Sequence, residues 1–196
     1  MKAIKLKNGE ALMLRTCAAD GGSSRGFVWP KSGPVECPDW KPNAKCGHGL
    51  HGLLWGEGDG SLLNWDADAA WLVVRIVESE AVDINGKVKV PNGTVEFFGD
   101  RLAAVKLIQK YAPAGKVIVG GTATAGYGGT ATAGYGGTAT AGDGGTATAG
   151  EDGVISIEYW NGEKYKRAVF AVGENGIEPN RPYRVNEKGE PVKATK

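Results

Sequence analysis

The sequence predicts a mostly β protein: a small α+β or mostly β domain with one helix, followed by a short two-sided parallel β-solenoid. Asn-Gly dipeptides between segments of alternating hydrophobicity are typical of β-hairpins. One segment has the apolar spacing of an amphipathic helix. A glycine-rich octad then repeats four times, which indicates a stacked array. We expect the first domain at 1–115 and the second at 116–196.

Composition and charge limit the classes of function. The 196 residues suffice for one large or two small domains, and 23 Lys+Arg balance 22 Asp+Glu. A near-neutral chain is not expected to bind nucleic acid or an anionic membrane mainly by charge. The sequence shows no signal peptide, its longest apolar run (69–74) is too short to span a bilayer, and three cysteines give no disulfide framework. We therefore expect a cytoplasmic protein.

Three Asn-Gly dipeptides predict β-hairpins, because Asn and Gly tolerate the positive φ that tight hairpin turns require. Two other dipeptides, Asn92-Gly93 and Asn175-Gly176, have weaker flanks and predict plain turns. The three hairpins join 3–7 to 11–14 through Asn8-Gly9, 71–84 to 87–90 through Asn85-Gly86, and 155–160 to 164–172 through Asn161-Gly162.

Residues 18–66 differ from the rest in their content of Gly, Pro and Trp. They hold four of the six tryptophans, and a fifth follows closely. Each buried Trp covers about 150–250 Å², so we expect irregular structure packed around a small aromatic core. The five residues are Trp29, Trp40, Trp55, Trp65 and Trp71.

One helix is expected near 100–111. Asp100 can accept hydrogen bonds from the free N–H groups at the helix start. Pro113 and Gly115 end the helix, and 112–115 is the expected domain boundary. The apolar stripe consists of Leu102, Ala104, Val105 and Ile108.

From Gly120 the segment Gly-Gly-Thr-Ala-Thr-Ala-Gly occurs at 120–126, 128–134, 136–142 and 144–150. In an extended strand, Thr-Ala-Thr-Ala directs both threonines to one face and both alanines to the other. The glycines between strands permit tight bends, and 12 of the chain's 32 glycines lie in this array. The predicted repeat face consists of Thr122, Thr124, Thr130, Thr132, Thr138, Thr140, Thr146 and Thr148.

One octad is too short to enclose a core, whereas two octads make a flattened coil of 16 residues with one strand on each side. The octads are then half-coils, and their alanines point inward. Larger apolar residues on both flanks (116–119 and 154–157) and the last hairpin are expected to cap the array. An antiparallel meander of four-residue strands and a disordered linker are the alternatives.

The octads resemble a known family. The segment 125–132, Ala-Gly-Tyr-Gly-Gly-Thr-Ala-Thr, is similar to the Ala-Gly-Tyr-Gly-Ser-Thr-x-Thr pattern of bacterial ice nucleation proteins, with Gly129 in place of Ser. The resemblance covers 120–151 and implies a β-solenoid whose stacked Thr-x-Thr rows order water. The repeat also resembles that of uncharacterised bacterial and phage-associated proteins with a Trp-rich N-terminal region.

Both histidines and two of the three cysteines lie close together in the first domain. Cys37, Cys46, His48 and His51 are four candidate Zn²⁺ ligands within fifteen residues, and Cys17 is a fifth. Their spacing matches no standard zinc finger. The alternative is a glycine-rich loop with a buried Cys and two surface histidines.

A second hypothesis for the first domain rests on Gly47–Gly52, which contains both histidines. The stretch, followed by alanines and Trp71, distantly resembles ADP-ribosyltransferase-like domains. That resemblance implies that His51 helps to hold NAD and that Glu96, on an expected strand at 94–98, orients the ribose.

The function that we expect from the sequence is non-enzymatic. Its Thr-x-Thr rows would bind ordered water or ice, a second copy of the chain, or a protein partner. No cofactor is expected for that role, and neither nucleic acid nor membrane is an expected partner. The alternatives are an NAD-related enzyme around His48 and His51, and a zinc-stabilised binding module.

Overall fold

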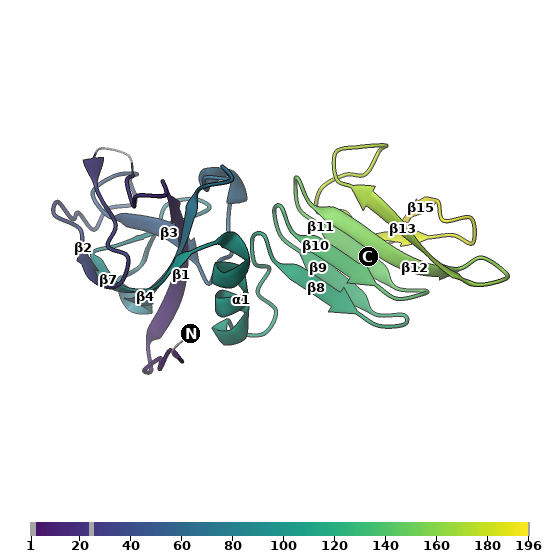
Figure 1. The fold of residues 1–196 in the computed structure, drawn as a ribbon, viewed down its shortest axis with the longest axis horizontal. Helices are drawn as coiled ribbons and strands as arrows, with labels where there is room; N and C mark the ends of the chain where they lie inside the picture. Colours follow the sequence, from purple (N-terminus) through teal and green to yellow (C-terminus); the bar gives the residue numbers. More distant parts are fainter. Residues whose placement is uncertain (1–2, 24–25, 196) are drawn as a thin grey trace. The chain divides into compact units, whose positions relative to one another are not determined.

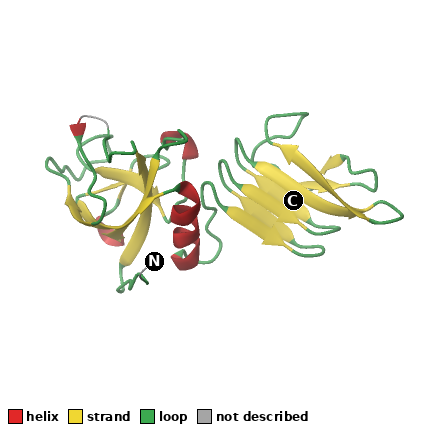
Figure 2. Cartoon of the chain, in the orientation of Figure 1, coloured by secondary structure: helices red, strands yellow, loops and turns green. Residues whose placement is uncertain are grey.

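The computed structural model describes residues 3–23 and 26–195. Within them the chain is mostly β with one α-helix, which confirms the predicted class (Figures 1 and 2). It forms two compact units, Met1–Lys116 and Val117–Lys196, here unit 1 and unit 2. In the described part, no helix combines the length and the apolar character needed to cross a membrane.

Unit 1 is built on one seven-stranded sheet in which every pairing is antiparallel. The strand order is β2-β7-β4-β1-β3-β6-β5. The central strands β1 and β4 pair along eight residues each, and most of their side chains are buried. The strands are β1 (Glu10–Cys17), β2 (Gly33–Glu36), β3 (Leu50–Leu54), β4 (Ala70–Val77), β5 (Val82–Asp83), β6 (Val88–Val90) and β7 (Asn92–Gly99).

The helix α1 (Arg101–Tyr111) packs against β1, β4 and β7 and confirms the prediction for 100–111 (Figure 1). Asp100 caps it by accepting a hydrogen bond of 2.9 Å from the backbone N–H of Ala103. The predicted apolar stripe is wrong at Leu102, which is 62% exposed, while Leu107 is buried in its place. Leu102 lies in the first turn, where the helix has not yet reached the sheet face that covers the later residues.

The first predicted hairpin is wrong. Asn8-Gly9 forms a turn, but residues 3–7 form no strand. Strand β1 has β3 on one edge and β4 on the other, so neither edge is left for the preceding segment.

The second hairpin is confirmed in a shorter form. Strands β5 and β6 pair around Asn85-Gly86, and both turn residues have positive φ (63° and 83°). The predicted strand 71–84 is interrupted: β4 ends at Val77 and a 3₁₀ turn, η3 (Glu78–Glu80), follows. Asn175-Gly176 is a turn as predicted, whereas Asn92-Gly93 lies inside β7, where it pairs with β2.

The Trp-rich segment is less irregular than predicted, because it contains β2, β3 and the 3₁₀ turn η2 (Gly60–Leu62). Three of its five expected core aromatics are buried: Trp29 and Trp71 are 2% exposed and Trp55 is 6% exposed. Trp40 and Trp65 are half-buried.

Unit 2 begins with the four octad strands, which alternate between two four-stranded sheets. Sheet I has the order β13-β12-β10-β8, and sheet II has the order β15-β14-β11-β9. Octad strands pair in parallel with the strand 16 residues away, as in Thr122↔Thr138 and Thr130↔Thr146, so they do not form an antiparallel meander. The strands are β8 (Thr122–Ala125), β9 (Thr130–Ala133), β10 (Thr138–Ala141), β11 (Thr146–Ala149), β12 (Val154–Trp160), β13 (Tyr165–Ala171), β14 (Tyr183–Val185) and β15 (Pro191–Lys193).

The core between the two sheets consists largely of alanine methyl groups. The alanines of β10 and β11 are at most 1% exposed, while the threonines alternate with them on the outer side, as predicted. Ile155 and Ile157 of β12 are fully buried and enlarge the core toward the end of the unit. Side chains of the closing segments complete it: Phe170, Val172, Ile177, Tyr183 and Val185.

The joints between octads explain the local glycine excess. Gly128 has a φ of 65°, which lets the backbone turn between β8 and β9. Its N–H donates to the carbonyl of Asp143 in the turn 16 residues later, at 2.9 Å, so successive turns stack. A Cβ on Gly142 would lie 2.7 Å from the backbone carbon of Gly126, so only glycine permits this approach.

Two hairpins close the last-formed side of the array. The third predicted hairpin is confirmed: β12 and β13 pair antiparallel from Val154↔Ala171 to Trp160↔Tyr165. On sheet II, β14 pairs antiparallel with β11 and then with β15. Strands β8 and β9 end the two sheets on the other side.

Candidate functional site

The outer face of sheet I carries a regular grid of threonines. Thr122 and Thr124 of β8 lie in register with Thr138 and Thr140 of β10. Parallel strands lie about 4.8 Å apart, and alternate residues of one strand are about 6.7 Å apart, so hydroxyl and methyl groups repeat in two directions. The third row is formed by β12, which places Val154 and Ser156 at the same positions.

The equivalent face of sheet II is partly covered. Arg184 of β14 donates a hydrogen bond from Nε to the Oγ1 of Thr146, at 3.1 Å, and Thr146 is only 8% exposed. Thr130 and Thr132 of β9 remain exposed. The eight predicted face residues thus point outward in both sheets, but sheet I presents the more open grid.

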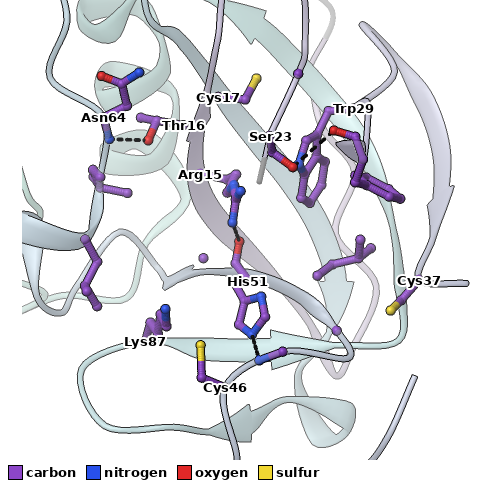
Figure 3. A pocket seen from close by; sticks show the side chains of 18 of the residues that line it. Arg15, Thr16, Cys17, Ser23, Trp29, Cys37, Cys46, His51, Asn64 and Lys87 are labelled. Atoms are coloured by element: carbon purple, nitrogen blue, oxygen red, sulfur yellow. Dashed lines mark hydrogen bonds between the residues drawn. The ribbon is translucent and has the colours of Figure 1, made fainter. Parts of the chain in front are cut away.

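Unit 1 contains a second feature of interest, a cavity of about 820 Å³ (Figure 3). Its walls come from the end of β1, the loop 18–29, the loop 37–49 and β3. Figure 3 shows Arg15 reaching the backbone of His51, where its Nη1 donates to the carbonyl oxygen at 3.1 Å. Burial lowers the pKa of Arg15, and its guanidinium carbon lies 5.3 Å from the centre of the Trp29 ring.

The four zinc candidates all line this cavity, but their polar atoms are directed to other partners. The Cys37 thiol donates to Asp39, which also holds His48 Nδ1 at 2.6 Å. These two hydrogen bonds lower the pKa of Asp39, and burial raises the pKa of Cys37. In residues 3–23 and 26–195, no three His, Cys, Asp or Glu side chains gather in a way that could hold a metal ion.

The two residues of the NAD hypothesis are not brought together. His51 lies on β3 and accepts a hydrogen bond at Nε2 from the backbone N–H of Gly47, which requires that nitrogen to be unprotonated. Glu96 lies on β7, with β1 and β4 between the two strands, at a separation of about 14 Å. Its Oε1 accepts a hydrogen bond of 2.7 Å from Arg75, outside the cavity.

Lys89 orders the loop that contains these candidates, and the sequence did not indicate it. This side chain of β6 is fully buried. Its ammonium donates to Asn43 Oδ1 and to the carbonyls of Lys45 and Gly47, at 2.8–3.1 Å, and lies 5.5 Å from the Trp40 ring centre. The alternation Val88-Lys89-Val90 would place a lysine on a solvent face, so only the long-range contacts reveal its role.

Comparison with known proteins identifies ice nucleation proteins as relatives. That of Xanthomonas campestris pv. translucens is 42% identical over 104 residues, which is 52% of this chain and 7% of that protein. InaU of Pantoea ananas is 39% identical over 105 residues, 53% of this chain and 10% of the relative. An ice nucleation protein of Pseudomonas syringae is 39% identical over 101 residues, 50% of this chain and 9% of the relative. No protein-family model and no solved structure matches the chain.

The chain spans a tenth or less of the length of these curated relatives. The aligned segments are longer than the 32 residues of 120–151, so the similarity extends beyond the four octads from which the resemblance was inferred. Over about half of its length, this protein resembles the ice nucleation proteins of bacteria.

Proposed function

We propose that unit 2 is a short β-solenoid whose threonine rows bind ordered water, and that the chain acts as a non-enzymatic, ice-nucleation-like protein. The observation that carries this proposal is the register of β8 and β10, which sets Thr122 beside Thr138 and Thr124 beside Thr140. The similarity to ice nucleation proteins supports it independently.

The chemistry of threonine suits this role. Each hydroxyl donates one hydrogen bond and accepts others, while the neighbouring methyl group excludes disordered water. Threonines are stiff at χ1, and the strands fix their spacing, so water bound along the grid is held at repeated positions. Because sheet II loses Thr146 to Arg184, sheet I is the stronger water-binding face.

The size of the grid limits what one chain can do. Two rows of threonines make a face about 10 Å wide, which orders few waters. Strands β8 and β9 end their sheets, and a strand end of this kind can pair with another chain. Self-association at this side of unit 2 would lengthen the rows, and we propose it as the way in which the activity grows.

Droplet-freezing measurements test the water-binding role. Replacing Thr124 and Thr140 together by Lys puts two long charged side chains on the sheet I grid and is expected to lower the freezing temperature of the protein solution toward that of buffer. The control is Thr146→Val, because that hydroxyl is already taken by Arg184. Circular dichroism establishes that both variants are folded. Equal freezing temperatures for the sheet I variant and the wild-type chain would exclude the proposed face.

Sedimentation velocity tests the self-association. We expect the mass of the full chain to rise with concentration. Thr122→Pro, which removes a backbone N–H from the β8 edge, is expected to reduce that rise more than the same change at Thr130 on the sheet II edge if sheet I leads the association. A monomer at every concentration would rule the association out and leave only the small single-chain face.

A further inference from the structure

Arg15 is a buried cation without an anionic partner. The side chain makes one hydrogen bond, to the His51 carbonyl, and one contact with the Trp29 ring among the described residues. Its Nε has less than 1 Å² exposed and no hydrogen-bond partner within that described part. Burying an unpaired charge costs several kcal/mol, so an isolated guanidinium is an unusual choice for a core position.

The charged groups around the cavity do not neutralise Arg15. Asp39 is the one carboxylate among the described lining residues, and it is held by Cys37 and His48. Cys17 is the group whose charge affects Arg15, but burial keeps that thiol protonated at neutral pH by raising its pKa. Lys87 adds a second positive charge to the lining. The cavity therefore has an excess of positive charge.

A second donor at the same place also has no partner. The indole Nε1 of Trp29 has less than 1 Å² exposed and no hydrogen-bond partner among the described residues. Trp29 and Arg15 line the same cavity, and Figure 3 shows them projecting from neighbouring parts of its wall. Two buried donors without acceptors in one cavity indicate that an acceptor is missing from the site.

We propose that this cavity binds a small ligand through an oxyanion group, a phosphate or a carboxylate, which pairs with the guanidinium of Arg15. The Nε and the adjacent Nη2 lie on one edge of the guanidinium, which matches the two oxygens of such a group. Nη1, on the other edge, stays with the His51 carbonyl and fixes the orientation.

The size and the other walls of the cavity suit a ligand larger than a bare ion. Its volume of about 820 Å³ lies in the range of small-molecule sites, which is roughly 300–1,000 Å³. Phe27 and Trp29 pack edge to face, with ring centres 5.6 Å apart, and both line the cavity. They offer an apolar surface beside the cation, which a planar ring on the ligand could contact.

The binding test uses the full chain labelled with ¹⁵N and three probes: inorganic phosphate, acetate and adenosine monophosphate, each at matched ionic strength against chloride. We expect a saturable shift of the Arg15 Nε–H and Trp29 indole N–H signals with at least one probe. Tighter binding of the nucleotide than of phosphate would indicate that the aromatic wall takes part, and acetate alone would indicate a carboxylate ligand. The absence of a saturable shift with all three would overturn the proposal.

Two variants separate binding from a purely structural role. Arg15→Gln removes the charge and is expected to weaken binding by about tenfold or more, because a charge-assisted hydrogen bond is lost. Arg101→Met removes a cation of unit 1 outside the cavity and is expected to leave binding unchanged. If Arg15→Gln is folded and the Trp29 signal still shifts as in the wild-type chain, the oxyanion does not bind at Arg15 and the proposal fails.

Discussion

Unit 2 fills its core with alanine methyl groups and takes its shape from glycine joints repeated every eight residues, whereas unit 1 buries single charged side chains. Lys89 is fully buried in unit 1, and Arg15 has a buried Nε. No comparable cation is buried in the described part of unit 2. The difference teaches that unit 2 is specified by a local period, which any octad supplies equally, while unit 1 depends on particular residues that no neighbour can replace.

The largest expected effect is that of Lys89→Met. The change leaves the acceptors on Asn43, Lys45 and Gly47 without their donor, and breaking such a buried charged network costs about 3–5 kcal/mol. Because five of the six tryptophans lie in unit 1, urea unfolding followed by Trp fluorescence reports mainly on this unit.

The control for that measurement is Lys106→Met on the exposed side of α1, where we expect a change below about 0.5 kcal/mol. A similar small loss for Lys89→Met would show that unit 1 tolerates the loss of single buried charges as readily as unit 2 tolerates changes on its outer face.

The next largest effect tests the stacking of the joints in unit 2. Gly142 and Gly126 occupy the same position of successive coils, but only Gly142 has another turn against it. A Cβ there would lie 2.7 Å from Gly126 and 2.8 Å from the backbone nitrogen of Tyr127, so Gly142→Ala is expected to cost about 1–3 kcal/mol.

The matched change Gly126→Ala meets no atom within 4 Å, and its φ is not positive. It is therefore expected to be neutral or to stabilise by up to about 1 kcal/mol, because alanine restricts the unfolded chain. Hydrogen exchange of the β10 and β11 amides measures both changes. Equal effects at the two positions would mean that the turns do not stack as described.

Much of unit 2 could be predicted because the information is local. The strand positions, the inward alanines and the outward threonines all follow from the octad itself. The same holds for the helix, which Asp100 caps within four residues. What the octads could not show is that Arg184, which lies 38 residues away, covers Thr146.

Unit 1 was less predictable because its sheet joins segments that are distant in sequence. The edge that the first hairpin needed is taken by β4, more than fifty residues later. The candidate ligands Cys37, Cys46, His48 and His51 do share one cavity, which their closeness in sequence indicated. Arg15 and Lys89 escaped notice because a lone cation in an apolar strand acquires its role only from partners elsewhere in the chain.

The smallest expected effect concerns the dependence of unit 1 stability on pH. The backbone N–H of Lys7, and then the guanidinium of Arg75, hold the pKa of Glu10 below its usual value of 4.5. Because the pKa is lower in the folded state, Glu10 stabilises unit 1 above about pH 4.5, and this contribution is lost as the pH falls through the folded pKa. Glu10→Gln should therefore reduce the loss of stability between pH 7 and pH 3, as measured by urea midpoints.

Glu80→Gln, an exposed carboxyl with no ion pair among the described residues, serves as the control and should keep the wild-type pH dependence. Unit 2 lacks an equivalent inside its octad array, where the repeated Thr, Ala and Gly residues carry no charge. Its amides in β8–β11 should accordingly exchange with nearly the same protection at both pH values, once the intrinsic rates are corrected. A parallel acid loss in both units would show that they unfold together and that their stabilities do not rest on separate kinds of contact.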